Sequence, residues 1–364
     1  MSQDQPLKPV LSASVHDVRH FAALLRGVNF ANRATVTISK AGLVINVEEA
    51  RTLLGTAYVN ADLFDEYTFS HPTSHSVRNR QSQSPPSSPA ENPEDEQEVN
   101  VAFEIPLNTL IECLNIFGTA GALPNSNTHN GKKERKWRRV DDDDDEGRFG
   151  EERETRTGPI DNYFSRGKDE KKTGMRMSFL GAGYPLTLLI AEDSTGPTTT
   201  CEITTFDPEP SLELPFDSET TVLKIILKSS WLRDALLELD PSCDKLTFIG
   251  NPPHPPNSSM GASVKPMLRI QAAGTFGSTE MDYPNDKEVL ESFACTHPLS
   301  VSYHTAHISR TARALASSTK TSLRIDERGL LSLQFLMPSA GVGGAKKGTD
   351  AFIEFRCLAL DSDL

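Results

Sequence analysis

The stretch VLSASVHDVRHFAALLRGV, residues 10–28, decides the fold because it joins a strand directly to a helix. Val10 to Ala13 is predicted to form a short strand. From Val15 to Val28 the apolar side chains recur at helical spacing, which predicts a helix with one buried side. The rest of the chain can be interpreted as repeats of this unit.

Four copies of a strand-helix-strands unit can be counted along the chain. In the first copy, strands follow the helix at Ala34 to Ser39, Leu43 to Val47, Leu53 to Val59 and Glu66 to Phe69. The second copy has a strand at Val101 to Ile105, a helix at Leu107 to Phe117, and strands at Met175 to Leu180, Pro185 to Ala191 and Thr198 to Phe206. The third has a strand at Val222 to Leu227 and a helix to Leu239, capped by Ser229 or Ser230. The fourth has a strand at Ser300 to His304, a helix at Ala306 to Ala316, and strands at Thr321 to Asp326, Leu330 to Leu336 and Ala351 to Leu358.

These copies group into two domains of α+β architecture. The first covers residues 8–206 and contains two polar insertions, 71–98 and 119–173, whose composition predicts disorder. Residues 207–218, with three prolines, are expected to connect the domains. The second domain covers residues 219–360.

Bulk composition narrows the class of protein. The net charge of -13 argues against a generally phosphate-binding surface, but it leaves open a local basic one. The five cysteines lie far apart without a C-x-x-C pair, so neither a disulfide framework nor a metal site is expected. The chain also lacks a signal peptide pattern and an apolar run of ~20 residues. We therefore expect a soluble intracellular protein without a cofactor, a metal or a membrane partner.

Several short phrases, taken in their order and spacing, carry a family resemblance. They are Val44 to Ala50, Leu63 to Tyr67, Cys113 to Gly118, Gly183 to Leu186, Leu232 to Ala235, Glu238 to Asp240, Thr275 to Gly277, Met281 to Pro284 and Arg328 to Gln334. Together they resemble the Rad-one type subunits of the 9-1-1 DNA-damage checkpoint clamp. The resemblance covers most of the chain outside the two insertions.

The resemblance implies a PCNA-like fold, with antiparallel sheets outside and helices on the inner face of a ring. It implies a heterotrimer with Rad-nine-like and Hus-one-like subunits, placed on double-stranded DNA in the nucleus by a separate ATP-driven clamp loader. The implied function is a non-catalytic platform for checkpoint signalling and DNA repair. Uncovered strands near Cys201 to Phe206 and Thr275 to Asp282 are the expected pairing edges, so this chain should not close a homotrimer.

A clamp needs cations on its helices, because DNA inside a ring is held through phosphate contacts that carry no sequence information. The expected DNA-facing residues are His16, Arg19, His20, Arg26, Lys228, Arg233, Arg310 and Arg313. On the first helix the four of them lie opposite the apolar stripe. The second helix, which exposes Asn108, Glu112 and Asn115, offers no cation. The alternative for any single helix is a face that is merely solvated.

Two other classes of function stay open. A DNA exonuclease is one, because such activity has been attributed to some relatives, although a nuclease wants carboxylates gathered around metal ions. The acidic run Asp141 to Glu146 and the pair Asp207 and Glu209 lie in a predicted loop and in the connector, so no catalytic residue is assigned. The chain has no phosphate-binding loop for ATP. A scaffold that binds only protein is the second alternative.

The longer insertion carries two motifs. A basic cluster resembles a nuclear-import signal and consists of Lys132, Lys133, Arg135, Lys136, Arg138 and Arg139. The second resembles the peptide by which replication proteins dock on sliding clamps, and its residues are Thr157, Ile160, Tyr163 and Phe164. The same apolar residues could instead pack on this chain's own connector near Leu212 to Phe216.

Overall fold

Antiparallel pairing builds each sheet of the computed structural model, which describes residues 8–70, 100–120, 172–192, 196–253, 266–338 and 351–360. The helices are few and short, so the predicted α+β class holds for this part of the chain. Insertion residues 71–98 and most of 119–173 lie outside the described residues.

The first unit follows the predicted order closely. Its elements are β1 (Leu11–Val15), α1 (Val18–Gly27), β2 (Arg33–Ser39), β3 (Gly42–Glu49), β4 (Leu53–Asn60), a 3-10 turn (Ala61–Leu63) and β5 (Glu66–Phe69). The helix begins at Val18 and not at the predicted Val15, because the Asp17 side chain caps it by accepting a hydrogen bond from the Arg19 amide at 3.0 Å.

The second unit holds the next helix and the end of the first half. Its elements are β6 (Val101–Pro106), α2 (Leu107–Leu114), β7 (Gly174–Phe179), β8 (Leu186–Ala191) and β9 (Thr198–Ile203). The predicted helix to Phe117 is three residues too long, and the predicted strand to Phe206 ends at Ile203. Phe206 instead forms an isolated bridge with Glu104 on β6.

The third unit has more strands than the sequence revealed. Its elements are β10 (Thr221–Lys228), α4 (Ser229–Leu237), β11 (Cys243–Gly250), β12 (Leu268–Gly274), β13 (Gly277–Tyr283) and β14 (Leu290–Cys295). Neither predicted serine caps α4: Ser229 is already helical, Lys228 is the cap residue, and the Ser229 hydroxyl lies 2.9 Å from that of Thr321.

The fourth unit contains a broken helix. Its elements are β15 (Leu299–His304), α5 (Thr305–Ser309), α6 (Ala312–Ser317), β16 (Lys320–Asp326), β17 (Leu331–Met337) and β18 (Ala351–Cys357). The single helix predicted at Ala306 to Ala316 is wrong. Hydroxyl groups compete for the backbone carbonyls at the break, where Thr311 donates to the Ile308 carbonyl at 2.7 Å.

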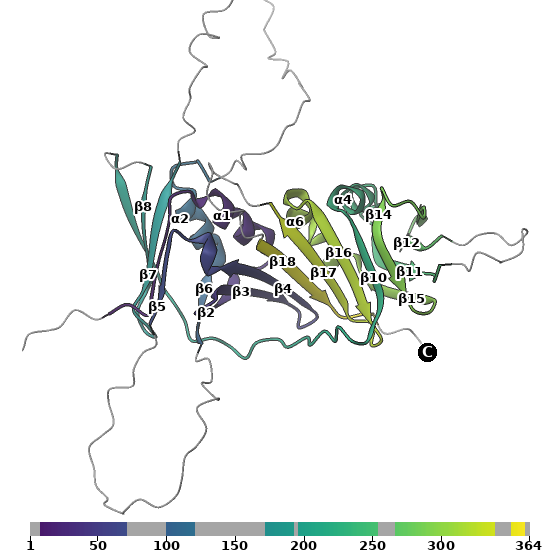
Figure 1. Cartoon of the computed structure of the whole chain (residues 1–364), viewed down its shortest axis with the longest axis horizontal. Coiled ribbons are helices and arrows are strands. Elements are labelled where there is room, and N and C mark those ends of the chain that lie inside the picture. Colours follow the sequence, from purple (N-terminus) through teal and green to yellow (C-terminus); the bar gives the residue numbers. More distant parts are fainter. Residues whose placement is uncertain are drawn as a thin grey trace, which may run out of the picture. The chain divides into compact units, whose positions relative to one another are not determined.

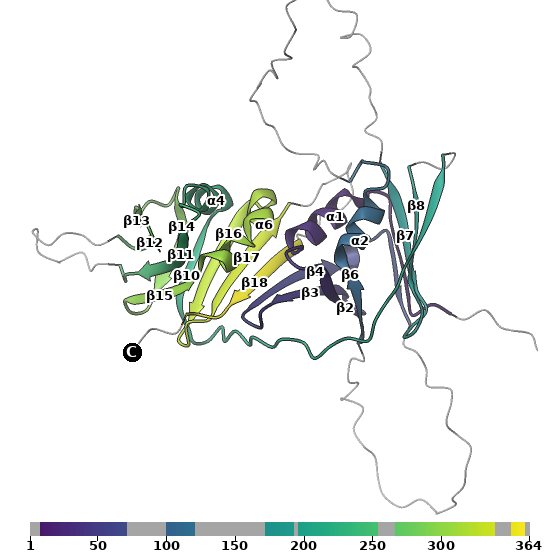
Figure 2. The same cartoon turned by 180° about the vertical axis from the view of Figure 1, so that it is seen from behind.

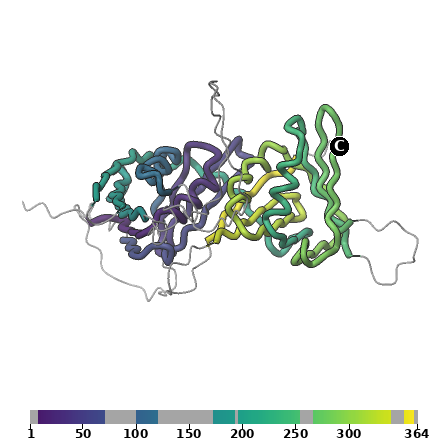
Figure 3. The backbone as a smooth tube through the Cα atoms, turned by 90° about the horizontal axis from the view of Figure 1, so that it is seen from above, coloured from purple at the N-terminus to yellow at the C-terminus, as the bar shows by residue number. Residues whose placement is uncertain are grey.

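Three sheets result, and the largest joins the two halves of the chain. The strand orders are β5-β1-β7-β8-β9, then β14-β10-β16-β17-β18-β4-β3-β2-β6, and β13-β12-β11-β15. Strands β18 and β4 pair over six residue pairs, from Phe352 opposite Tyr58 to Cys357 opposite Leu53. Figure 3 shows this meeting of the earliest (purple) and latest (yellow) parts of the chain.

The helices and the connector lie on opposite sides. Helices α1, α2, α4 and α6 lie along the upper side in Figure 1, where α6 contacts both α1 and α4, and α1 contacts α2. The connector, residues 207–218, runs along the lower side from β9 to β10 (Figure 2). A continuous apolar core fills the space between the sheets and the helices in both halves.

Candidate functional site

The start of α1 carries the first of the predicted DNA-facing residues. Arg19 directs its guanidinium back onto Asp17, with Nη2 2.7 Å from Oδ2 and Nε 3.0 Å from Oδ1. Burial alone would raise the pKa of Asp17, but the hydrogen bonds from Arg19 outweigh it, so this pKa lies below its ordinary value. Arg19 therefore locks the helix start as an ion pair.

Two of the four residues predicted on the open side of α1 are buried. Arg19 is 6% exposed and His20 is 8% exposed, so the prediction that they lie on an accessible face is wrong. The chain returns to the start of α1 at the end of the second insertion, where the Thr173 carbonyl accepts from the Val18 amide at 3.0 Å. Helical spacing shows which side of a helix is polar, but not which distant segment covers it.

His20 is an unusual residue for such a place. Neither ring nitrogen has a hydrogen-bond partner among the residues that the structure describes, and burial lowers the pKa of the imidazole, with Asp17 opposing the shift. The neighbouring His16 is exposed and its Nδ1 lies 2.9 Å from the Asp65 carboxylate. Arg26, at the other end of α1, donates to the Ala120 carbonyl at 2.6 Å. The two ends of the insertion thus rest on α1.

The remaining cations lie on the helices of the second half. Arg310 pairs with Glu49 through two hydrogen bonds of 2.9 Å, and Arg313 donates to the Asn29 carbonyl at 2.9 Å. Arg233 pairs with its neighbour Asp234 at 2.9 Å. Lys228 is exposed, and its side chain has no hydrogen bond or ion pair within the described ranges.

Half of the eight predicted residues already face a carboxylate within the chain. Arg19, Arg233 and Arg310 each hold a carboxylate, and His16 faces one. A phosphate would have to compete with those partners, whereas Arg313 binds only a backbone carbonyl among the residues described. Arg26, Arg313 and Lys228 are the candidates that could bind phosphate without breaking an ion pair among the described residues.

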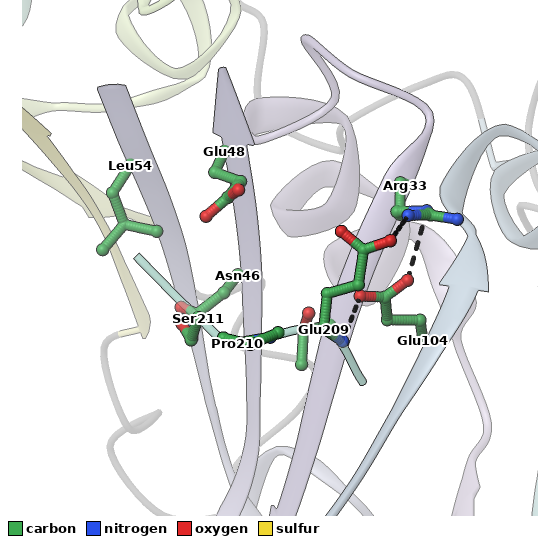
Figure 4. A pocket seen from close by; sticks show the side chains of 9 residues that line it. Arg33, Asn46, Glu48, Leu54, Glu104, Glu209, Pro210 and Ser211 are labelled. Carbon is green, nitrogen blue, oxygen red and sulfur yellow. Dashed lines mark hydrogen bonds and ion pairs between the residues drawn. The ribbon is translucent and has the colours of Figure 1, made fainter. Parts of the chain in front are cut away.

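The connector covers a polar pocket on the other side of the sheet. The pocket has a volume of about 170 Å³ and lies among the side chains labelled in Figure 4. Arg33 forms ion pairs with both Glu104 and Glu209, and the Glu209 amide donates to Glu104 at 2.8 Å. Further along, the Leu212 amide donates to Glu48 at 3.1 Å. Side chains of the sheet thus hold the connector backbone.

The second half of the connector is fixed by arginines. Arg356 donates to the Leu214 carbonyl at 2.9 Å and Arg328 to the Pro215 carbonyl at 2.7 Å, while Arg324 stacks over the Phe216 ring at 4.7 Å. Leu212 and Leu214 turn inward and pack in a small apolar cluster with Leu54, Leu330 and Phe216. The connector's own apolar residues therefore already occupy this side of the sheet.

A buried carboxylate organises those arginines, and sequence reasoning missed it. Glu354 on β18 is 3% exposed and binds Arg324 at 3.1 Å, Arg356 at 2.8 Å and the Ser332 hydroxyl at 2.7 Å. Burial raises its pKa, but the hydrogen bonds from Arg356 and Ser332 outweigh burial and lower it overall. The sequence signal is a pair of charged residues, Glu354 and Arg356, in a strand whose other residues are apolar.

Among the described residues six strands end the three sheets, namely β5, β6, β9, β13, β14 and β15, and β9 and β13 are the two predicted to pair with other subunits. Within the described residues β9 pairs only with β8, and β13 pairs only with β12, as predicted for the pairing edges. Large apolar side chains are exposed on elements near these two strands. In the part of the sequence before β13 they are Trp231 and Leu237 on α4 and Phe276 in the turn. Near β9 they are Ile116 after α2, Leu189 on β8 and Phe206 after β9 itself. Exposed apolar groups beside an open strand mark a surface that binds another protein.

The described residues contain no group of three or more His, Cys, Asp or Glu side chains placed to hold a metal ion. None of the helices described is long and apolar enough to span a membrane. The basic cluster at 132–139 and the motif at Thr157, Ile160, Tyr163 and Phe164 lie outside the described residues.

Comparison with known proteins adds a consistent family signal. A family model described as "Repair protein Rad1/Rec1/Rad17" matches residues 10–337. The chain is 28% identical to the cell cycle checkpoint protein RAD1 of Mus musculus over 350 residues, covering 95% of this chain and 91% of that protein. It is 30% identical to the DNA repair exonuclease REC1 of Mycosarcoma maydis over 450 residues, covering 97% and 96%. It is 26% identical to the DNA damage checkpoint control protein rad1 of Schizosaccharomyces pombe over 344 residues, covering 94% and 84%.

Proposed function

The chain belongs to the Rad1/Rec1/Rad17 family of repair proteins, and we propose that it is a non-catalytic subunit of a heterotrimeric checkpoint clamp that encircles DNA. The sister subunits are of the Rad-nine and Hus-one types, the complex acts in the nucleus, and a separate ATP-driven loader places it on double-stranded DNA. The names of the relatives, which speak of cell cycle checkpoint and DNA damage checkpoint control, support this role.

The composition of the sheets is the observation that carries the proposal. The nine-stranded sheet consists of five strands from one repeat pair, β14-β10-β16-β17-β18, joined to four from another, β4-β3-β2-β6. The remaining sheets are one of five strands, ending in β9, and one of four strands, ending in β13. Joining β9 to the β13-type edge of a neighbour produces the same nine-stranded sheet between subunits. Repeating that joint around a circle generates a closed ring.

The two-domain description belongs to the same proposal. The domains are residues 8–206 and 219–360, linked by the connector, and the β18–β4 pairing is the joint between them. The helices, which lie on the side opposite the connector, face DNA. Arg26, Arg313 and Lys228 are the strongest phosphate contacts, because none of them holds a carboxylate among the described residues, and His16, Arg233 and Arg310 are contacts that first have to exchange a carboxylate partner.

The test is topological. The chain is assembled with its two sister subunits and loaded onto nicked circular DNA. A closed ring remains on circular DNA at high salt and slides off once the circle is cut, because sequence-independent phosphate contacts alone are lost at high salt. Equal retention on circular and linear DNA, or loss from both at high salt, would refute the encircling role.

An exonuclease is the second candidate, supported by the name of the Mycosarcoma maydis relative. Within the residues described, no carboxylate cluster suits the metal ions that such an enzyme needs. Digestion of end-labelled DNA by the purified chain with Mg²⁺ or Mn²⁺, abolished by a chelator, would support the enzyme and contradict the non-catalytic role.

A further inference from the structure

The pairing of β18 with β4 inside the chain serves as a template for strand pairing between subunits. Hydrogen-bond register shows which residues of β9 correspond to those of β18, and which residues of β13 correspond to those of β4. One row of paired residues in the second half runs through Leu223, Ile325, Leu331 and Cys357. The matching row in the first half runs through Leu11, Phe179, Leu186 and Ile203. Cys357 on β18 therefore corresponds to Ile203 on β9. Four residues earlier, Ile353 corresponds to Thr199.

The same comparison relates β4 to β13. One row runs through Phe103, Val36, Ile45 and Ala57, and its counterpart runs through Val301, Phe248, Ile270 and Met281. The helices confirm the match, because α2 and α5 begin at Leu107 and Thr305, four residues after the first member of each row. Ala57 on β4 therefore corresponds to Met281 on β13.

The internal joint pairs Ile353 with Ala57, so the transferred register sets the Thr199 position of one subunit opposite Met281 of the next. Because the strands are antiparallel, the Thr200 position then lies opposite Glu280. The Thr198 position lies opposite Asp282. These assignments follow from register alone.

The chemistry of the β13 edge differs from that of the internal joint. Glu280 and Asp282 share a single partner, Arg269, and remain 46% and 49% exposed, so this side of the edge carries a net negative charge. At the internal joint the place of Asp282 is taken by Tyr58, whose ring stacks on Phe352 with centroids 4.4 Å apart. Burial, followed by the charges of Asp234 and Glu238 on or just after α4, raises the pKa of Tyr283 to about 12, so these carboxylates also lie near the edge.

The helix layer differs in the same place. At the internal joint α1 presents Gly27, and a Cβ there would lie 3.7 Å from Ala314 of α6, so the helices approach closely. The equivalent helix beside β13 is α4, on which Leu237 is 72% exposed and Trp231 is 45% exposed. A partner has to cover these apolar groups as well as meet the carboxylates.

A second copy of this chain fits that surface poorly. In the transferred register its threonines 198 and 200 would face Asp282 and Glu280, offering neither opposite charge nor an aromatic stack. Its Glu202, which is exposed, would lie diagonal to Glu280, where like charges repel. The homotypic joint therefore lacks the interactions that hold β18 to β4.

We propose that the β13 edge, with α4 beside it, binds the β9-type edge of a sister subunit that carries basic side chains opposite Glu280 and Asp282 and an apolar side chain over Leu237. The same surface rejects the β9 edge of a second copy of this chain. The proposal rests on the ring assignment and adds the chemistry of one of its joints. Electrostatic complementarity of this kind selects partners more than it adds affinity.

The first experiment measures binding of the full chain to each purified sister subunit by analytical ultracentrifugation over a range of salt concentrations. Glu280→Lys should weaken binding to one sister roughly tenfold or more, because it sets like charges opposite each other, and should leave the other sister unaffected. Binding to the affected sister should also be the more salt-sensitive of the two. Asp282 keeps its bidentate pairing with Arg269 in this variant, so the edge remains folded.

The matched control is Glu202→Lys, which changes a charge of the same sign on the β9 edge and should not weaken binding to that same sister. Unchanged affinity of Glu280→Lys for both sisters would overturn the proposal. Failure of the wild-type chain to bind either sister would instead overturn the ring assignment itself.

A gain of function tests the register with this chain alone. Thr198→Lys combined with Thr200→Lys supplies the cations that the register sets opposite Asp282 and Glu280. The double variant should self-associate at low salt, dissociate as salt rises, and lose this behaviour when Glu280→Lys is added. Thr198→Glu with Thr200→Glu is the matched control and should remain monomeric. A Lys double variant that is monomeric at every salt concentration would refute the register.

Discussion

The substitution Gly27→Ala tests how tightly the two halves of the chain are joined. Gly27 is the last residue of α1 and faces β18 and α6. A Cβ at this position would lie 2.3 Å from Ile353 Cδ1 and 3.7 Å from Ala314 Cβ. Ile353 is fully buried, so its terminal methyl group can move only by displacing other core atoms.

Two opposing terms set the size of the effect. Alanine is favoured over glycine within a helix by about 1 kcal/mol. Forcing an additional methyl group into a packed core costs about 1–3 kcal/mol. Because the contact at 2.3 Å is far inside van der Waals distance, we expect the second term to win and Gly27→Ala to lower the free energy of unfolding by about 1 kcal/mol.

A double-mutant cycle separates the clash from other effects. Ile353→Val removes Cδ1 and alone should cost about 1 kcal/mol. In the double variant the new Cβ occupies the vacated space. The loss of unfolding free energy in the double variant should therefore be about 1–2 kcal/mol smaller than the sum of the losses in the two single variants. Ile325→Val is the matched control, since this isoleucine on β16 is equally buried but lies outside the contacts of Gly27.

The assay is urea unfolding of the purified chain followed by circular dichroism, with the m-value checked for each variant. Additivity of Gly27→Ala with Ile353→Val within about 0.5 kcal/mol would refute the close contact. Stabilisation by Gly27→Ala alone would refute it as well, because only the helix-propensity term would then be acting.

Three further predictions concern the site. In a salt titration, Arg313→Gln should reduce the salt slope of DNA retention by the loaded ring by about 0.9. Arg19→Gln should leave that slope unchanged and should instead lower the free energy of unfolding, measured in urea, by about 1–3 kcal/mol. The pKa of Glu354 is lowered in the folded chain, so its contribution to stability is present above the ordinary pKa of about 4.3 and is lost as pH falls through the folded pKa. Glu354→Gln should flatten this loss of stability at acid pH and lower the free energy of unfolding at pH 7 by on the order of 3 kcal/mol. An unchanged dependence of stability on acid pH would contradict the pairing. A labelled peptide of residues 153–172 should bind a replicative clamp or this chain's folded core with micromolar affinity in a fluorescence titration and lose binding on Tyr163→Ala; binding to neither would mark the segment as a linker.

The order of strands and helices could be predicted because their hydrophobic periods are local properties of the chain. Strand β5 has the predicted bounds Glu66 to Phe69, and β2, β3 and β4 differ from prediction by one or two residues at an end. The structure also has β9 and β13 at sheet edges, as the family resemblance implied, while their pairing with other subunits stays a prediction. The phrases that carry the family resemblance lie in these same elements.

The sequence predicted the bounds of helices and strands less well where side-chain hydroxyl groups or loops determine them. The break between α5 and α6 depends on whether the Thr311 hydroxyl binds a backbone carbonyl of its own turn. The strands β11 to β14 had no predicted bounds apart from the edge near β13, although β12 alternates buried and half-buried residues over its first five positions.

Which charges face solvent was decided only by tertiary structure. The sequence by itself determined that α1 has a polar side holding Arg19 and His20, because the side on which a helical residue lies follows from its position in the sequence. It could not determine that Arg19 and His20 are buried, or that Glu354 gathers Arg324 and Arg356 beneath the connector. Those contacts join residues far apart in the sequence, and the burial of a charge depends on everything that packs around it.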